Sequence, residues 1–306
     1  MSFIRRSLDR ILFSKRAFDL FQRIGVHVTP NHFYSPVPDT RELDRRAGLW
    51  DKESDMPGVD LRPAAQLEWL RRVVSPLRHE CSFPLDPTGV PHEYFVRNGA
   101  FGLISAAVLH CMVRHFSPRT LIEIGSGNST YVSARAVLMN QAEGKPGRLL
   151  AVEPHPGEVL RRGFPGLTRL IPEKVQDLGR DLFTGLQAGD ILFIDSSHVV
   201  RMENDVLFLY LDVLPRLAKG VVVHIHDIFL PRHYPRRWVV EGRRFWTEQY
   251  LLQAFLTWNP CFEVLWSGCL MQLRHPEVLR SVFPLPEGLS AEEGYASSSF
   301  WMRRVG

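Results

Sequence analysis

Residues 119–130 constrain the fold of this chain more than any other stretch. They read RTLIEIGSGNST, in which a short apolar run ends at a turn with two glycines and a helix-like segment follows. This order is typical of the first strand, turn and helix of a nucleotide-binding α/β sheet. Glycine has no Cβ and lets a ligand approach the backbone, and Ser129 or Thr130 can cap the new helix. Ordinary turn chemistry would give the same pattern, so the residues that follow must decide.

A regular alternation of apolar runs and helical segments follows the turn. The expected strands are 121–124, 149–153, 167–171, 191–195, 221–226, 262–267 and 297–304. The expected helices between them are 129–141, 157–163, 179–187, 201–218 and 245–258. Such alternation indicates a parallel sheet. We predict a doubly wound, Rossmann-like α/β fold with a mostly parallel seven-stranded sheet, an antiparallel terminal strand and an N-terminal helical extension.

Residues 1–90 are expected to form a helical and loop extension that packs on a core domain of residues 91–306. Residues 1–27 alternate apolar and basic positions at helical spacing. Docking on the protein's own core or on a second subunit of a homo-oligomer is the favoured interpretation, and peripheral contact with an acidic membrane is the alternative. Residues 30–39 hold three prolines and predict an extended loop, either over a pocket mouth or tied to the core by Phe33.

The composition argues against several kinds of partner. The formal net charge is only +4 and the arginines occur in scattered pairs, whereas nucleic-acid binding requires a clustered basic face. The four cysteines lack metal-binding spacing, which suggests reduced thiols in a cytoplasmic protein. We expect no transmembrane segment, because no apolar run approaches the roughly 18 residues that a spanning helix needs.

Acidic residues follow the second and third expected strands. In such a sheet the ligand lies across the carboxyl ends of the strands, where the strand order reverses. Glu153 is expected there to accept hydrogen bonds from a ribose diol, although a surface acid is the alternative. Asp177 or its neighbour is expected near an adenine amine, although a helix-capping role explains Asp177 equally well.

The fourth and fifth expected strands end in IDSSH and VHIHDIF, which hold most of the chemically versatile side chains. The two ends should be neighbours and bring together Asp195, His198, His224, His226 and Asp227. Buried carboxylates and imidazoles this close need paired charges or a metal. Two interpretations stay open: a divalent ion such as Mg²⁺ or Mn²⁺ on Asp195, His226 and Asp227, or a histidine that acts as general base without metal.

A segment after the fifth strand, FWTEQY, is expected to border a pocket for a second substrate. Glu248 and Gln249 lie in this segment. Helix core is the favoured interpretation for both residues, and a direct role in the site is the alternative.

These residues resemble a known family. The motif EIGSG at 123–127, Glu153, Asp195 and the two terminal strands are similar to class I S-adenosylmethionine-dependent methyltransferases. The stretches HFYSPVPD, FIDSSHVV, HIHDIFLPRHYP and FWTEQYLLQAFL resemble a bacterial branch related to cephalosporin-hydroxylase and catechol-O-methyltransferase-like enzymes. The resemblance covers roughly residues 94–304 and implies the methyltransferase fold for this part of the chain.

The resemblance also implies a set of ligand-binding residues. The residues expected at the S-adenosylmethionine site are Glu123, Gly125, Ser126, Gly127, Ser129, Thr130, Glu153, Asp177, Asp195 and Ser196. In the catechol-type enzymes a fourth-strand acid and two adjacent fifth-strand residues hold Mg²⁺, and the matching positions are Asp195, His226 and Asp227. His226 stands where those enzymes carry an acid, and Asn128-Ser129 replaces the third glycine of the common turn. The metal therefore stays open between Mg²⁺, Mn²⁺, Fe²⁺ and none.

The expected function is S-adenosylmethionine-dependent methylation of a small-molecule or saccharide hydroxyl. His198, His226 and Asp227 are the expected catalytic residues, which deprotonate the acceptor directly or with a metal. Two alternatives stay open. The first is an NAD(P)-linked oxidoreductase, which requires a third glycine in the turn and a Tyr/Lys or His pair on the hydride side. The second is a non-catalytic nucleotide-binding protein, which would not need the many His and Asp residues at the ends of the fourth and fifth strands.

Overall fold

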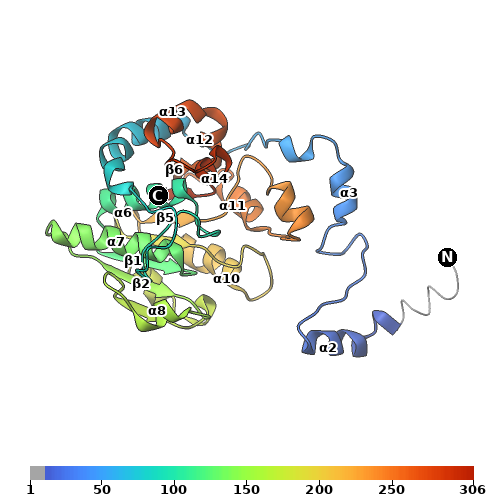
Figure 1. Ribbon diagram of the computed structural model, residues 1–306. Helices are drawn as coiled ribbons and strands as arrows, with labels where there is room; N and C mark the ends of the chain where they lie inside the picture. The colour runs from blue at the N-terminus through green and yellow to red at the C-terminus, as the bar shows by residue number, and fades with distance from the viewer. Residues whose placement is uncertain (1–10) are drawn as a thin grey trace. The chain divides into compact units, whose positions relative to one another are not determined.

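The computed structural model describes residues 11–306, so the predicted helix at the start of the chain lies partly outside the described residues (Figure 1). The chain divides into two compact units. One reaches to Asp51 and includes Pro235–Phe245, and the other consists of Lys52–Tyr234 and Trp246–Gly306.

The larger unit contains a seven-stranded sheet of order β3-β2-β1-β4-β5-β7-β6. Its strands are β1 Thr120–Ile124, β2 Arg148–Val152, β3 Arg169–Ile171, β4 Ile191–Ile194, β5 Val222–Ile225, β6 Phe262–Ser267 and β7 Phe300–Arg304. The first five strands are parallel, and β7 runs antiparallel to both β5 and β6. The predicted doubly wound sheet is therefore confirmed, and its strand order reverses between β1 and β4.

Helices follow the strands as the alternation predicts. Helix α6 Leu103–Phe116 precedes β1, and α7 Asn128–Ala142, α8 Glu158–Arg162 and α9 Asp181–Thr184 follow the first three strands. The expected helix 201–218 is broken into α10 Asp205–Leu207, the π-helical η5 Phe208–Val213 and the 3₁₀ segment η6 Leu214–Arg216. Pro215 explains the final break, because a proline inside a helix removes a backbone hydrogen bond. The helix expected over 245–258 is α11, Glu248–Leu256.

Three short helices precede β7, namely α12 Gly268–Arg274, α13 Pro276–Val282 and α14 Ala291–Tyr295. The sequence pattern predicts no element there, because helices of one or two turns leave little periodicity to detect.

The core lies on both faces of the sheet, since successive strand residues point to opposite sides. On one side α6 and α7 pack over residues such as Leu121 and Phe193. On the other side α11 and the helical segments after β4 pack over residues such as Ile122 and Leu192. Every residue of β1 is buried, as expected for a central parallel strand that is covered on both faces.

A buried ion-pair network joins residues 52–90 to this core. Glu80, in the 3₁₀ segment η3 Arg78–Cys81, accepts hydrogen bonds at Oε2 from Arg114 Nε at 2.8 Å and contacts His110 Nε2 at 2.8 Å. Ahead of η3 stand α4 Pro63–Trp69, the π-helical η2 Leu70–Val74 and α5 Ser75–Leu77. The predicted domain boundary at residue 90 stays a prediction, and the structure keeps residues 52–90 in the unit that holds the sheet.

The smaller unit contains α2 Lys15–Arg23, α3 Thr40–Arg45, η1 Leu49–Asp51 and η7 Arg237–Glu241. Arg236 Nε donates a hydrogen bond to Asp44 Oδ1 at 2.7 Å, which joins the two chain segments of this unit. Residues 30–39 form the expected loop without a helix or strand. Phe33 is 94 % exposed, so it is not buried within the smaller unit. Over residues 11–306 we find no helix with the length and apolar character needed to cross a membrane.

A buried acid at the end of β1 fixes the start of α7. Glu123 is completely buried, and its Oε1 accepts hydrogen bonds from the Ser129 and Thr130 hydroxyls, both at 2.7 Å. Ser133 donates to Oε2 at 3.0 Å. Burial raises the pKa of Glu123 to about 7, although the hydroxyl donors oppose this shift. The carboxyl group therefore holds the first turn of α7 against the strand.

The raised pKa of Glu123 predicts a stability that falls as the pH rises. The unfolded carboxyl group has a lower pKa, so the folded state binds more protons above about pH 4.5 and the stabilisation is lost through about pH 7. We expect this group to lower the free energy of unfolding by roughly 2 kcal/mol between about pH 5 and pH 8. Urea unfolding across that range should show a flatter profile for Glu123→Gln. An unchanged slope in the variant would contradict the assignment.

Candidate functional site

A cleft of about 310 Å³ opens at the carboxyl ends of β1, β2 and β4, where the strand order reverses. Its lining includes Gly125, Glu153, Gln176, Asp195 and Ser196. A second cleft of about 330 Å³ lies beside α7 and is lined mainly by apolar and aromatic side chains. No strand-end residue contributes to that second cleft, so we place the candidate site at the first.

The first cleft contains only part of the predicted ligand-binding set. Glu153 lines it, with Oε2 accepting a hydrogen bond from the Ser126 N–H at 3.2 Å and Oε1 one from the His155 N–H at 2.7 Å. After β3 the cleft is lined by Gln176, the neighbour of the predicted Asp177.

Three other predicted residues, Glu123, Ser129 and Thr130, lie buried behind the turn. They form the anchor of α7 instead of the wall of the cleft. Thr130 Oγ1 also accepts a hydrogen bond from the Gly127 N–H at 2.9 Å, which caps the helix as the sequence suggests.

The two glycines of the turn serve different purposes. Gly125 has a φ of +75°, and a Cβ on it would stand 1.7 Å from the carbonyl oxygen of Asp195. Only glycine fits there, because the turn and the end of β4 touch backbone to backbone. Gly127 is extended, with a φ of −173°, and a Cβ on it would meet no atom within 4 Å. Gly125 is therefore required by the fold, whereas the space at Gly127 is free for a ligand.

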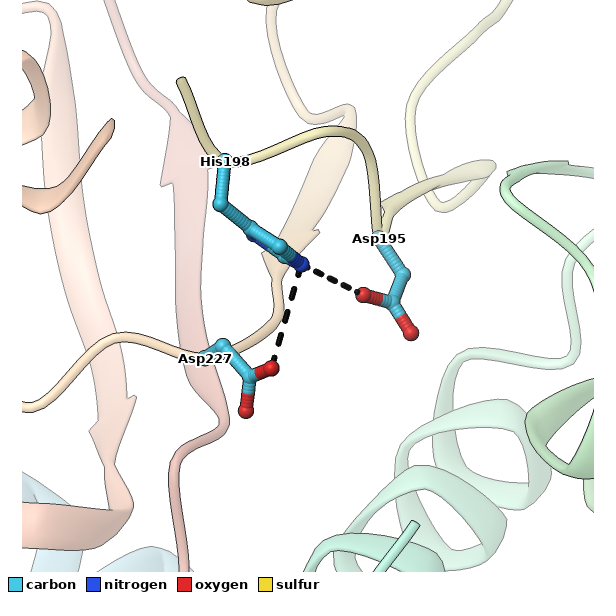
Figure 2. A group of neighbouring side chains, drawn as sticks. All are labelled: Asp195, His198 and Asp227. Carbon is cyan, nitrogen blue, oxygen red and sulfur yellow. Dashed lines mark ion pairs between the residues drawn. The ribbon is translucent and has the colours of Figure 1, made fainter. Parts of the chain in front are cut away.

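Asp195, His198 and Asp227 converge at the ends of β4 and β5 (Figure 2). His198 Nε2 lies 3.2 Å from Asp195 Oδ1 and 3.8 Å from Asp227 Oδ2. One ligand atom from each residue lies within 4.8 Å of the others. The predicted meeting of the two strand ends is thus observed, with His198 in the central position.

Glu248 holds the His198 ring from the other side. His198 Nδ1 lies 2.9 Å from Glu248 Oε2, and the Trp246 ring packs on the imidazole at a centroid distance of 4.3 Å. The His198 carbonyl oxygen accepts hydrogen bonds from the Thr247 and Glu248 N–H groups at 2.8 and 3.0 Å. His198 itself has a φ of +60°, and Glu248 is completely buried. The start of α11 therefore orients the ring so that Nε2 faces the two aspartates.

His226 and His224 occupy different positions from the central group. His226 is 3 % exposed, packs against Phe101 at a centroid distance of 4.7 Å, and places Nε2 at 3.5 Å from Asp227 Oδ1. His224 is completely buried between Phe193 and Trp301, at centroid distances of 4.1 and 4.6 Å. Burial lowers the pKa of His224 well below the ordinary value, so it is a neutral core residue. His224 stacks on the His226 ring at a centroid distance of 5.5 Å, so it lies beside the predicted cluster but does not belong to the group of Asp195, His198 and Asp227.

Asp227 reaches the site because β5 ends before it. The strand stops at Ile225, and Asp227 has a φ of +54°. Its side chain is therefore released from the strict alternation that would turn it away from His226. The Ser298 hydroxyl donates a hydrogen bond to Asp227 Oδ1 at 2.8 Å and holds the carboxylate in place.

The charges of the group are strongly coupled. Burial alone would lower the pKa of His198. Asp195 and Glu248 raise it by a larger amount, so the pKa lies well above the ordinary value. Burial raises the pKa of Asp195, but His226 and His198 lower it more, so the net pKa lies below the ordinary value. These shifts favour a protonated His198 beside an ionised Asp195, whereas burial raises the pKa of Glu248. The same donor set suits a divalent cation once the imidazole loses its proton.

Comparison with known proteins agrees with this location. A family model described as a methyltransferase domain matches residues 122–228, from β1 to just beyond β5. Residues 122–228 are therefore similar to methyltransferase domains. The matched segment contains the glycine turn, Glu153 and the three converging side chains.

Individual relatives are distant. An uncharacterized protein of Archaeoglobus fulgidus is 28 % identical over 186 residues, which cover 58 % of this chain and 80 % of that protein. The O-methyltransferase TomG of Streptomyces achromogenes, solved with S-adenosylmethionine, is 18 % identical with a TM-score of 0.38, covering 83 % of this chain and 92 % of its own. An O-methyltransferase of Bacillus cereus, solved with S-adenosylhomocysteine, is 16 % identical with a TM-score of 0.35, covering 79 % and 91 %. Scores this low carry no conclusion, so the assignment depends on the family model.

The two glycines predict losses of different size for alanine substitution. Gly125→Ala should lower the free energy of unfolding by about 2 kcal/mol or more, because Cβ would overlap a backbone carbonyl in a left-handed conformation. Gly127→Ala should cost about 1 kcal/mol or less, the usual loss at a helix N-cap. Chemical denaturation of both variants measures the difference. Equal losses would show that the turn does not distinguish them.

Proposed function

We propose that this chain transfers a methyl group from S-adenosylmethionine to a hydroxyl of a small molecule. The observation that carries the proposal is the shared position of Asp195. This residue lines the cleft beside the glycine turn and also belongs to the converging group with His198 and Asp227. A donor in the cleft would therefore end beside side chains able to accept a proton.

The cleft residues fit an adenosyl ligand. Glu153 lies at the end of β2, and a carboxylate in this position can accept hydrogen bonds from both hydroxyls of a ribose. Gln176 offers an amide for the edge of the base, in the role expected of Asp177 or its neighbour. The space above Gly127 allows the methionine part of the donor to approach the backbone.

The chemistry requires alignment and removal of one proton. When bound, S-adenosylmethionine supplies a methyl group on a positively charged sulfur that needs little further activation. The chain must then orient the acceptor hydroxyl toward that methyl group and take its proton. His198 is suited to this task in its neutral form, because Glu248 fixes Nδ1 and leaves Nε2 to face the reacting side. The ring must first lose the proton that Asp195 and Glu248 favour in the isolated protein.

A divalent cation is compatible with the same residues. Asp195, His198 and Asp227 would hold it through two carboxylates and one neutral imidazole, a mixed donor set suited to Mn²⁺ or Mg²⁺. A bound cation would lower the pKa of an acceptor hydroxyl. The geometry favours His198 over His226 as the nitrogen ligand, because His198 Nε2 lies between the two aspartates.

The rival functions have less support. An NAD(P)-linked oxidoreductase would use the same kind of sheet, but the turn lacks the third glycine of that fingerprint. A non-catalytic binding protein would not need His198 held by a buried carboxylate. A saccharide acceptor is the narrower proposal within the small-molecule class, and it comes from the family resemblance.

Calorimetry tests the donor. We expect S-adenosylmethionine and S-adenosylhomocysteine to bind the wild-type protein and NAD⁺ not to bind. Gly127→Ala should weaken S-adenosylhomocysteine binding by about tenfold or more, because the added Cβ enters the ligand space. A stable Gly127→Ala protein with unchanged affinity would remove the turn from the donor site. Binding of NAD⁺ without either adenosyl ligand would overturn the proposed function.

Mn²⁺ binding followed by electron paramagnetic resonance tests the metal ligands. His198→Gln and Asp227→Asn should each weaken Mn²⁺ binding by about tenfold or more, since each removes one ligand. His226→Gln is the matched control and should retain the wild-type affinity. If His226→Gln abolishes binding and His198→Gln does not, the ligand set is Asp195, His226 and Asp227. If the wild-type protein binds no Mn²⁺, the metal-assisted mechanism is rejected, and the proposal keeps His198 as the base.

A further inference from the structure

Helix α2 has an apolar face, and none of its side chains is buried within the smaller unit. Steps of about 100° per residue place Ala17, Leu20, Phe21 and the C-capping Ile24 on one side of the helix. Leu20 is 60 % exposed and Ile24 is 68 % exposed. The opposite side carries the polar residues Lys15, Arg16, Asp19, Gln22 and Arg23.

The helix is well defined despite this exposure. Ser14 caps its start by accepting a hydrogen bond from the Ala17 N–H at 3.2 Å. Lys15 Nζ pairs with Asp19 Oδ2 at 2.6 Å, one turn apart on the polar side. The residues just before Ser14 extend the apolar surface, with Ile11 67 % and Leu12 42 % exposed.

The excess positive charge of the chain is concentrated in the same region. Residues 1–27 contain six of the 37 lysines and arginines and two of the 33 acidic residues, which leaves 31 of each in the rest of the chain. The formal net charge of +4 therefore belongs entirely to this segment. Basic and apolar side chains on opposite faces of one helix are the pattern of segments that lie in the interface of an anionic bilayer.

We propose that α2 and residues 11–14 dock on an anionic membrane surface. The apolar face would enter the headgroup region, and the basic side chains would meet the lipid phosphates. A second copy of the chain is a poorer occupant, because its α2 carries the same positive charge. The proposal is independent of the proposed methyl transfer, which takes place in the larger unit.

Flotation of the full-length protein with lipid vesicles tests this surface. We expect binding to phosphatidylcholine vesicles that contain about 30 % phosphatidylglycerol, and about tenfold weaker binding to pure phosphatidylcholine. Raising the salt to about 0.5 M NaCl should reduce binding to the anionic vesicles, because exposed charges are screened. Equal binding to both kinds of vesicle, or to neither, would overturn the proposal.

Matched variants separate the helix face from general surface effects. Leu20→Glu should weaken vesicle binding by about tenfold or more, because it places a charge on the apolar face. Leu211→Glu is the control, since Leu211 is 59 % exposed and lies outside the segment. Arg16→Gln combined with Arg23→Gln should remove much of the salt dependence without changing the apolar face.

Two results with these variants would contradict the docking surface. An equal loss with Leu20→Glu and Leu211→Glu would show that the apolar face of α2 has no special role. Sedimentation that detects a dimer lost in Leu20→Glu, with no vesicle binding by the wild-type protein, would assign the face to a second copy. Circular dichroism of each variant establishes that the fold is retained.

Discussion

The site depends on one backbone contact at the centre of the sheet. Gly125 lies so close to the Asp195 carbonyl that no side chain fits between them. This contact fixes the end of β4 relative to the turn after β1. It therefore also fixes the position from which the Asp195 side chain extends. Beneath the turn, the buried Glu123 carboxyl and three hydroxyls hold α7 in register. The wall of the cleft and the edge of the polar group are thus one rigid piece.

The polar group is built from long-range partners on this frame. His198 follows β4, Asp227 follows β5, and Glu248 begins α11, 50 residues beyond His198 in sequence. Burying a single carboxylate costs desolvation free energy. The His198 imidazole offsets the charge of Glu248, and Asp195 and Asp227 offset the charge of the imidazole. The cluster is therefore coupled, and removal of one member changes the charge balance of the others.

Local sequence patterns predict the sheet but only part of the site. Strand ends are visible in the sequence, so the apolar runs alone assign Glu153, Asp195 and Asp227 to one edge of the sheet. His224 and His226 share one face by alternation, and nothing local reveals that His224 packs between two aromatic rings. Glu248 has the spacing of a helix-core residue, and its partner is too distant in sequence to be inferred. The left-handed conformations of His198 and Asp227 have no sequence signal either, because they result from tertiary contacts.

The smaller unit has a consequence for how the protein is made. Its two segments meet through Asp44 and Arg236, which are 192 residues apart in the chain. A ribosome adding about 5–20 residues per second needs roughly 10–40 s to make the intervening stretch. The nascent N-terminal segment therefore spends that period without its contacts to Pro235–Phe245, while most of the sheet is already being synthesised. Although it emerges first, this unit is completed only after β5 has left the ribosome.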